Sequence, residues 1–178
     1  YRDIETLNLY QERLEKGYDK EEIMRSIHAK SRDNARTPMQ WNDRENAGFT
    51  AGKPWIKINP NYREINAAKQ TEDEDSVFRC YQELIRFRKE YPVFAEGEFR
   101  MLLGTDEDIF AYTRTDGDSQ LLVICNFHDR TVKCPLETPE PDGKLLIGNY
   151  RDRAGGPDGT LLLRPYEARM YLKAAPKA

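Results

Sequence analysis

The sequence predicts an α+β fold in which a helical and loop-rich first half is followed by an all-β second half. Helical periodicity recurs in the chain up to about residue 90, and a period of two governs the chain after Val93. The 178 residues can bury the core of one or two domains, but they are short for a complete (β/α)8 barrel, which takes roughly 250 residues. We therefore expect two domains, over residues 1–92 and 93–178.

Two short helices are predicted at the start of the first domain. The first covers residues 3–16 and ends at Gly17, because glycine readily adopts the left-handed conformation that terminates a helix. The second covers residues 19–29, with Asp19 as its N-cap. Ile4, Leu7 and Leu14 fall on one face of the first helix. Ile23, Met24 and Ile27 form the expected buried stripe of the second.

The stretch over residues 31–49, SRDNARTPMQWNDRENAGF, mixes charged, aromatic and turn-forming residues without a helical or strand period. We expect an ordered loop that is held by side-chain hydrogen bonds and continues to residue 70. Its aromatic residues Trp41, Phe49 and Trp55 are expected to be buried anchors rather than platforms for sugar rings. Ordered loops of this length are usually functional.

A longer helix is predicted over residues 71–90. Thr71 and Glu74 have the spacing of a capping box, basic residues fill the last turns, and Tyr91 and Pro92 end the helix. Short apolar or alternating runs follow, separated by turn signals. They are EFRMLLG, DIFAYTRT, QLLVICNF, RTVKCPL, KLLIGN, TLLLRP and EARMYLK, and they predict an antiparallel sandwich or barrel.

Composition excludes several classes of partner. Lys and Arg number 28 against 31 Asp and Glu, with the signs interspersed, so no nucleic-acid partner is predicted. No apolar run approaches the roughly 20 residues of a membrane span, and no membrane partner is predicted. The three cysteines and two histidines lack metal-ligand spacing, so we predict reduced thiols, no metal and no cofactor. A cytoplasmic protein is expected.

The run SRDNARTPMQW followed by NAGF resembles the segment after the last barrel strand in glycoside hydrolase family 13, the α-amylase family. The branch that it resembles is that of the oligo-1,6-glucosidases and α-glucosidases. YRDIETLNLYQERL near the start and RPYEARMYL near the end are similar to the same enzymes in the same order. The resemblance implies that residues 1–92 are the last part of the (β/α)8 catalytic domain, with 71–90 as its final outer helix, and that 93–178 are the C-terminal β-sandwich.

What the resemblance implies about function is a retaining α-glucosidase that hydrolyses α-1,6 or α-1,4 bonds at the non-reducing end of short oligosaccharides. Such an enzyme needs a carboxylate nucleophile and a carboxylic acid roughly 5 Å apart. In the resembled family both lie on barrel strands that precede the matched segment, and none of the surrounding motifs is present. We therefore assign no catalytic residue, expect the missing N-terminal barrel as a partner, and expect this chain alone to be inactive.

Arg36 is the candidate substrate-binding residue. The resemblance implies that it contacts a hydroxyl of the terminal glucose and an upstream carboxylate, and a guanidinium can donate to both at once. The residues alone leave open that Arg36 only ties the loop together through Asp33 or Asp43. Arg32 and Asp33 are expected to brace the loop.

Other functions stay open at the level of the sequence. Trehalose-6-phosphate hydrolases, dextran glucosidases and sucrose isomerases have similar loops, and the sequence does not choose among them. A stand-alone carbohydrate-binding sandwich would use exposed aromatic residues, for which the candidates are Tyr112, Tyr150, Tyr166 and Tyr171. Exposed apolar surface on helices 3–16 and 71–90 would favour a homodimer of the chain.

Overall fold

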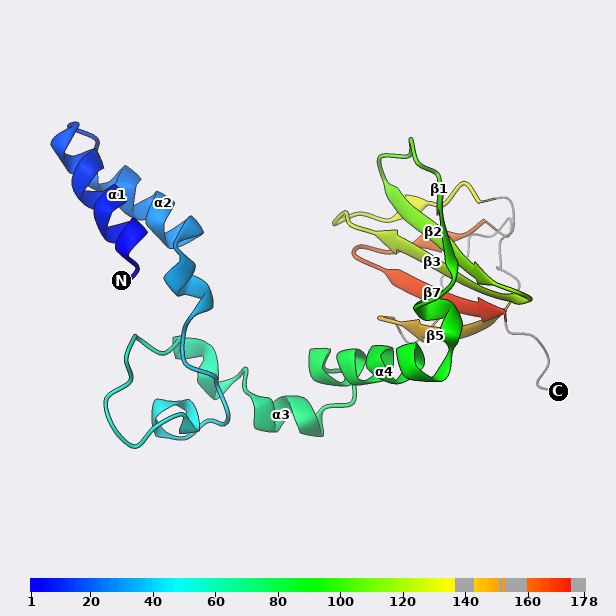
Figure 1. Cartoon of the computed structure of the whole chain (residues 1–178), viewed down its shortest axis with the longest axis horizontal. Helices are drawn as coiled ribbons and strands as arrows, with labels where there is room; N and C mark the ends of the chain where they lie inside the picture. The colour runs from blue at the N-terminus through cyan, green and yellow to red at the C-terminus, as the bar shows by residue number, and fades with distance from the viewer. Residues whose placement is uncertain (137–142, 151, 153–159, 174–178) are drawn as a thin grey trace. The chain divides into compact units, whose positions relative to one another are not determined.

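A computed structural model describes residues 1–136, 143–150, 152 and 160–173. The chain divides into two compact units, Tyr1–Cys80 and Tyr81–Ala178. Helices and loops make up the first unit, and the strands of the described residues all lie in the second (Figure 1). The α+β organisation expected from the sequence is therefore present.

Two capped helices open the first unit, α1 (Ile4–Glu15) and α2 (Lys20–Lys30). The carboxylate of Asp19 caps α2 as predicted, because it accepts a hydrogen bond of 3.0 Å from the backbone of Glu22. Ile23 and Ile27 of α2 are buried, as predicted. In α1, by contrast, Ile4 and Leu7 of the apolar face are exposed.

The loop that follows is ordered mainly by hydrogen bonds. The backbone amides of Trp41 and Asn42 both donate to the carbonyl of Ala47, at 2.9 and 3.2 Å. Gly48 has a φ of +66°, and a Cβ there would lie 2.4 Å from the side-chain amide of Asn42, so the turn requires glycine. The short 3₁₀ turns of the loop are η1 (Arg32–Ala35), η2 (Glu45–Gly48) and η3 (Pro60–Arg63).

The aromatic residues of this loop do not have the predicted environment. Trp41, Phe49 and Trp55 are all exposed, and Trp41 is 52% exposed. The prediction that they are buried anchors is therefore wrong for this structure. The reason is that backbone and amide hydrogen bonds hold the loop without ring burial, as when Gln40 donates to Asn61 at 3.1 Å.

The predicted single helix over 71–90 is also wrong, because the chain forms α3 (Ala67–Glu72) and α4 (Val77–Glu90) with a break between them. Thr71 is no N-cap, since its hydroxyl donates to the carbonyl of Ala68 at 2.7 Å. Asp73 instead accepts a hydrogen bond from the backbone of Asp75 at 2.9 Å, and Ser76 accepts one from Arg79 at 3.2 Å. These local side-chain bonds compete with a continuous helix and favour a turn followed by a new cap.

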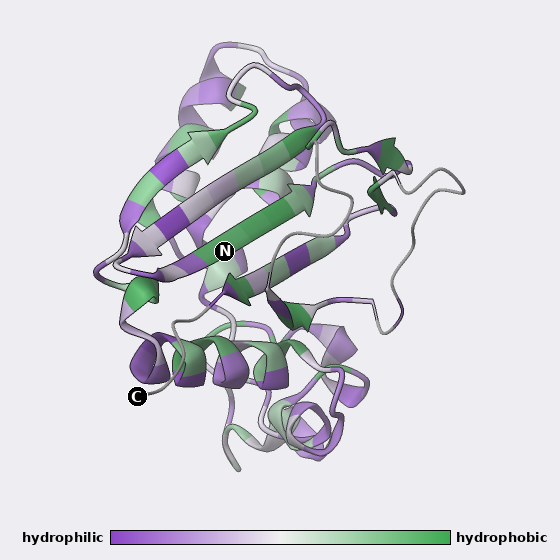
Figure 2. Cartoon of the chain, turned by 90° about the vertical axis from the view of Figure 1, so that its right-hand side faces the viewer, coloured by the Kyte–Doolittle hydropathy of each residue, from purple (hydrophilic) through white to green (hydrophobic). Residues whose placement is uncertain are grey.

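Strands dominate the second unit, and each predicted run contains one. The strands β1, β2, β3, β7 and β5 form an antiparallel sheet in that order, and β4 pairs with β6. The central strand β3 is largely hydrophobic. Hydrophobic strand residues are green in Figure 2. The bounds are β1 (Glu98–Leu102), β2 (Ile109–Asp116), β3 (Ser119–Asn126), β4 (Val132–Lys133), β5 (Lys144–Gly148), β6 (Leu162–Leu163) and β7 (Ala168–Lys173).

The main core lies between the five-stranded sheet and the β4–β6 pair. Ala111, Ile124 and Tyr171 from the larger sheet are buried in one cluster with Val132 and Leu163 from the smaller one. Because two layers share this cluster, the unit is a two-layered β-sandwich.

The opposite face of the five-stranded sheet receives the 3₁₀ turn η4 (Pro92–Phe94), which follows α4. Val93 is buried there with Leu121, Val123 and Leu172. The guanidinium of Arg114 donates to the carbonyl groups of Val93 and Ala95, at 3.2 and 3.0 Å. Both apolar contacts and hydrogen bonds therefore attach η4 to the sheet.

Candidate substrate-side site

The predicted site residues come together where the start of α1 meets the η1 turn. Asp33 is 2% exposed, and its Oδ2 accepts hydrogen bonds from the backbone amides of Arg2 and Asp3, at 2.6 and 2.9 Å. These two backbone hydrogen bonds are the main reason that the pKa of Asp33 lies below its usual range. Asp33 therefore remains ionised at neutral pH and connects two segments that are about thirty residues apart.

Asp3 is the second acid of the cluster. Its Oδ2 caps α1, because it accepts hydrogen bonds from the backbone amide and the hydroxyl of Thr6 at 3.1 and 3.0 Å. Its Oδ1 lies 3.3 Å from Nη2 of Arg32 and 3.5 Å from Nη1 of Arg36. The spacing of Asp3 and Thr6 could have revealed the cap, but no sequence signal connects Asp3 to the two arginines.

Arg36 lies between the two carboxylates. Its Nη1 is 3.5 Å from Oδ1 of Asp3 and 3.8 Å from Oδ1 of Asp33, and its side chain is 46% exposed. Among the described residues, Nη1 is the only nitrogen of this guanidinium that makes a polar contact, and no ion pair joins Arg36 to Asp43. The contact between Arg36 and Asp33 that would hold the loop together is therefore present. The other nitrogens of Arg36 keep their donors free, so substrate binding by Arg36 stays a prediction.

Arg32 makes contacts of the kind that a bracing residue would make. Its Nη2 lies 2.6 Å from the carboxylate of Glu5 and 3.3 Å from that of Asp3. The hydroxyl groups of Thr6 and Ser31 are 2.8 Å apart and connect the same two segments. The bracing roles of Arg32 and Asp33 remain predictions.

Two open cavities lie beside this cluster, within the size range of small-molecule pockets. One has a volume of about 470 Å³ and the other of about 430 Å³. Asp33 lines the larger cavity, whereas Arg36 lines neither. The other residues around the larger cavity are Tyr1, His28, Asn34, Thr37, Ile56, Lys57, Ile58, Asn59 and Pro60.

The cluster does not have the geometry of a glycosidase acid and nucleophile. Asp33 is buried and held by two amides, and Asp3 is engaged as a helix cap, so neither carboxylate is available to a sugar. In the residues that the structure describes, no group of three acidic, histidine or cysteine side chains could hold a metal ion. A search of all the described residues found no helix with the length and hydrophobicity of a membrane span.

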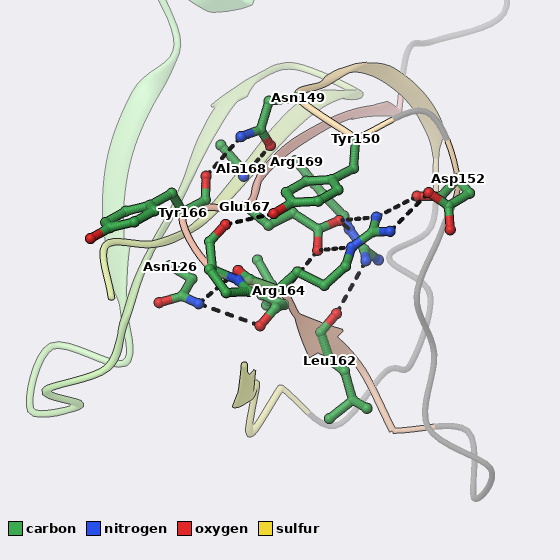
Figure 3. A network of polar contacts seen from close by, with 12 residues as sticks. Asn126, Asn149, Tyr150, Asp152, Leu162, Arg164, Tyr166, Glu167, Ala168 and Arg169 are labelled. Carbon is green, nitrogen blue, oxygen red and sulfur yellow. Dashed lines mark hydrogen bonds and ion pairs between the residues drawn. The ribbon is translucent and has the colours of Figure 1, made fainter. Parts of the chain in front are cut away.

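A second polar network, in the sandwich, was not singled out from the sequence (Figure 3). Glu167 is 1% exposed and Arg169 is 4% exposed. The two form an ion pair in which Nε of Arg169 lies 2.7 Å from Oε1 of Glu167. Glu167 also accepts from the backbone and side chain of Arg164, at 2.8 and 3.0 Å. Burial opposes the ionisation of Glu167, but these hydrogen bonds outweigh it and lower its pKa. The network joins β6 to β7, because the guanidinium of Arg169 also donates to the carbonyl of Leu162 at 3.1 Å.

The tyrosines proposed for a carbohydrate-binding sandwich do not form one exposed surface. Tyr171 is buried, and Tyr112 is partly buried against the core around Val93. The hydroxyl of Tyr150 donates to the carbonyl of Pro165 at 2.9 Å, whereas Tyr166 is exposed. This arrangement disfavours a sugar platform built from these four residues.

The chain is a helical, loop-rich unit followed by a β-sandwich unit, and two family models match it. Residues 4–97 match the family model described as alpha amylase, catalytic domain, and residues 109–169 match alpha-amylase SusG C-terminal domain. The chain belongs to the α-amylase family.

Individual proteins are also similar to the chain over nearly its whole length. The chain is 48% identical to an oligo-1,6-glucosidase of Halalkalibacterium halodurans, over 97% of this chain and 31% of that protein. The solved structure of Bacillus licheniformis trehalose-6-phosphate hydrolase matches with a TM-score of 0.87 and 40% identity, over 97% of this chain and 32% of that one. Isomaltulose synthase from Klebsiella sp. LX3 matches with a TM-score of 0.86 and 38% identity, at the same coverage. The chain thus spans about a third of the length of these relatives.

Proposed function

We propose that this chain is the C-terminal third of a retaining α-glucosidase of the oligo-1,6-glucosidase type. The intact enzyme hydrolyses α-1,6 or α-1,4 bonds at the non-reducing end of short oligosaccharides. The observation that carries this proposal is the 48% identity, over 97% of the chain, to a protein named oligo-1,6-glucosidase.

In this proposal the chain supplies one wall of the sugar site, and the preceding part of the catalytic domain supplies the nucleophile and the acid. Arg36 closes the subsite for the terminal glucose. Its Nη1 faces Asp3 and Asp33, and the remaining nitrogens of its guanidinium donate to a sugar hydroxyl. A closed subsite explains why such an enzyme would take glucose from a chain end.

The preceding part of the catalytic domain is also the proposed physical partner. In the first unit Ile4 and Leu7 of α1 are exposed, and α4 exposes Val77, Tyr81 and Ile85 at helical spacing. Apolar stripes of this kind mark surfaces that another element covers. We further propose a cytoplasmic location, where thiols such as that of Cys80 stay reduced, and cell fractionation would test it.

Without that partner the exposed stripes are expected to pair, so the 178-residue chain should form a homodimer at high concentration. Light scattering across a concentration series measures this. Replacing Tyr81 and Ile85 with lysine should shift the equilibrium to the monomer, because charges would then have to be buried in the contact. A chain that stays monomeric at every concentration would count against the proposed pairing.

The main test joins this chain to the part of the H. halodurans relative that precedes the aligned region. The chain alone should not hydrolyse isomaltose or a chromogenic α-glucoside, whereas the fusion should hydrolyse both. The unmodified relative is the matched control for expression and folding. Turnover by the chain alone, or a folded fusion without turnover, would each contradict the proposal.

Trehalose-6-phosphate hydrolase is the second candidate, because the B. licheniformis structure matches with a TM-score of 0.87. A matching fusion with that enzyme separates the two. The chain should reduce kcat/KM less in the oligo-1,6-glucosidase fusion than in the hydrolase fusion, each compared with its own parent. The reverse order would favour the second candidate.

A further inference from the structure

We propose that Asp3 and Asp33 are positioning residues for Arg36, and that they hold its guanidinium by one nitrogen so that the others face a ligand. What Arg36 binds rests on the proposed function. How Arg36 is held does not, because it follows from the contacts within the first unit.

The two oxygens of the Asp33 carboxylate have separate tasks. Oδ2 accepts the backbone amides of Arg2 and Asp3 and ties the start of α1 to the η1 turn. Oδ1 is buried without a hydrogen-bond partner in the described structure. A buried acceptor is rarely left unsatisfied, and the cation that faces this oxygen is Nη1 of Arg36 at 3.8 Å. Oδ1 therefore attracts the Arg36 side chain, whereas Oδ2 alone connects the η1 turn to the start of α1.

Asp3 contacts the same nitrogen of Arg36 through its own Oδ1. Its Oδ2 is occupied by Thr6, and its Oδ1 is shared between Arg32 at 3.3 Å and Arg36 at 3.5 Å. Arg32 has a shorter contact with Glu5, at 2.6 Å, which leaves Asp3 available to Arg36. Two carboxylates on one nitrogen restrict the direction in which the rest of the guanidinium points.

The backbone of Arg36 is fixed by the same residue that attracts its side chain. The amide of Arg36 donates to the carbonyl of Asp33 at 3.1 Å, as the C-cap of the η1 turn. A long side chain that is 46% exposed would otherwise sample many rotamers. Anchoring both ends pre-organises Arg36 before any ligand arrives.

The substitution Asp33→Asn separates positioning from bracing. The new amide can still accept the two backbone hydrogen bonds through its oxygen, but it places an NH₂ group opposite Nη1, donor against donor. Asp3→Asn likewise keeps the α1 cap and weakens the pull on Arg36. The matched control is Asp19→Asn, because Asp19 caps α2 in the same way and makes no arginine contact in the described structure.

The first measurement is ¹⁵N relaxation of the Arg36 Nε–H group by NMR in the full chain. Asp33→Asn and Asp3→Asn should each increase the mobility of this group, whereas Asp19→Asn should leave it unchanged. Backbone spectra of all variants should stay close to those of the parent chain. Unchanged mobility in both folded test variants overturns the proposal, and if one of them fails to fold, the other decides.

The second measurement uses the isomaltose-hydrolysing fusion. Asp33→Asn should raise KM about tenfold, because a charge-assisted hydrogen bond is weakened by misplacement rather than removed. It should have no further effect when Arg36→Met is already present, since the residue that it positions is then gone. Increased mobility of Arg36 with an unchanged KM would uphold the positioning and contradict the substrate role in the proposed function.

Discussion

Arg36→Ala is expected to reduce kcat/KM for isomaltose about 100-fold in the fusion enzyme. Hydrogen bonds from a charged donor contribute about 1.5–3 kcal/mol, and loss of the guanidinium also leaves the carboxylates of Asp3 and Asp33 without their shared cation. Steady-state kinetics with isomaltose over a range of concentrations measures the effect. Arg36→Lys should recover only part of the loss, because an ammonium keeps the charge but not the planar fork.

Arg44 provides the matched control for this experiment. It lies in the same loop, it is exposed, and its side chain forms no ion pair within the described structure. Arg44→Ala should therefore leave kcat/KM near that of the unmodified fusion. If the two alanine substitutions had equal effects, Arg36 would be only one of several loop residues, and its place in the sugar site would be refuted.

Glu167→Ala is expected to lower the free energy of unfolding of the sandwich by about 3–5 kcal/mol, which is the usual cost of leaving one member of a buried ion pair alone. Arg169 is 4% exposed and would lose the carboxylate that lies 2.7 Å away. Arg164 would lose the same partner. Urea unfolding followed by NMR signals of the β3 and β7 amides measures the change.

The chain supplies two internal controls for the Glu167 variant. Both tryptophans, Trp41 and Trp55, lie in the first unit, so their fluorescence reports that unit separately. Glu83→Ala removes an exposed carboxylate that lies 2.7 Å from Arg86, and it should change stability little, because exposed ion pairs contribute little. If Glu83→Ala lowered the free energy of unfolding as much as Glu167→Ala does, the role given to burial would be contradicted.

The same ion pair gives the sandwich a dependence on acid. The pKa of Glu167 is lower in the folded state, so its stabilisation is fully present above the ordinary glutamate pKa of about 4.3. It is lost as the pH falls through the lowered value. The parent chain should therefore lose stability in this range, and Glu167→Ala should lose less.

Local signals account for most of the secondary structure that could be predicted. Short apolar or alternating runs located the strands that the described part of the second unit contains, and Asp19 with Glu22 located the start of α2. The prediction failed between α3 and α4, where Asp73 and Ser76 form their own local hydrogen bonds. The spacing of apolar residues across 71–90 could not reveal that break. Hydrophobic periodicity carries no information about hydrogen bonds between a polar side chain and a nearby backbone amide.

The motif of the loop could be recognised from sequence, but the geometry of the candidate site could not. Arg32, Asp33 and Arg36 stand within five consecutive positions, whereas their partner Asp3 is about thirty residues away. Only folding of the η1 turn against the start of α1 brings these charges together. In the sandwich, Glu167 and Arg169 are two residues apart, a spacing that could have suggested an inward-facing pair at the start of β7.

By itself the sequence determined the family, the order of the strands, and the residues that carry the loop motif, because all of these depend on neighbours along the chain. Only the tertiary structure decided that two carboxylates hold Arg36 by one nitrogen, that the loop aromatics are exposed, and that Glu167 is buried between arginines. The contact between Asp3 and Arg36 joins segments that are remote in sequence, and the exposure of the loop aromatics and the burial of Glu167 depend on which elements pack over them. Such contacts and burial arise from packing and hydrogen bonding rather than from local propensity.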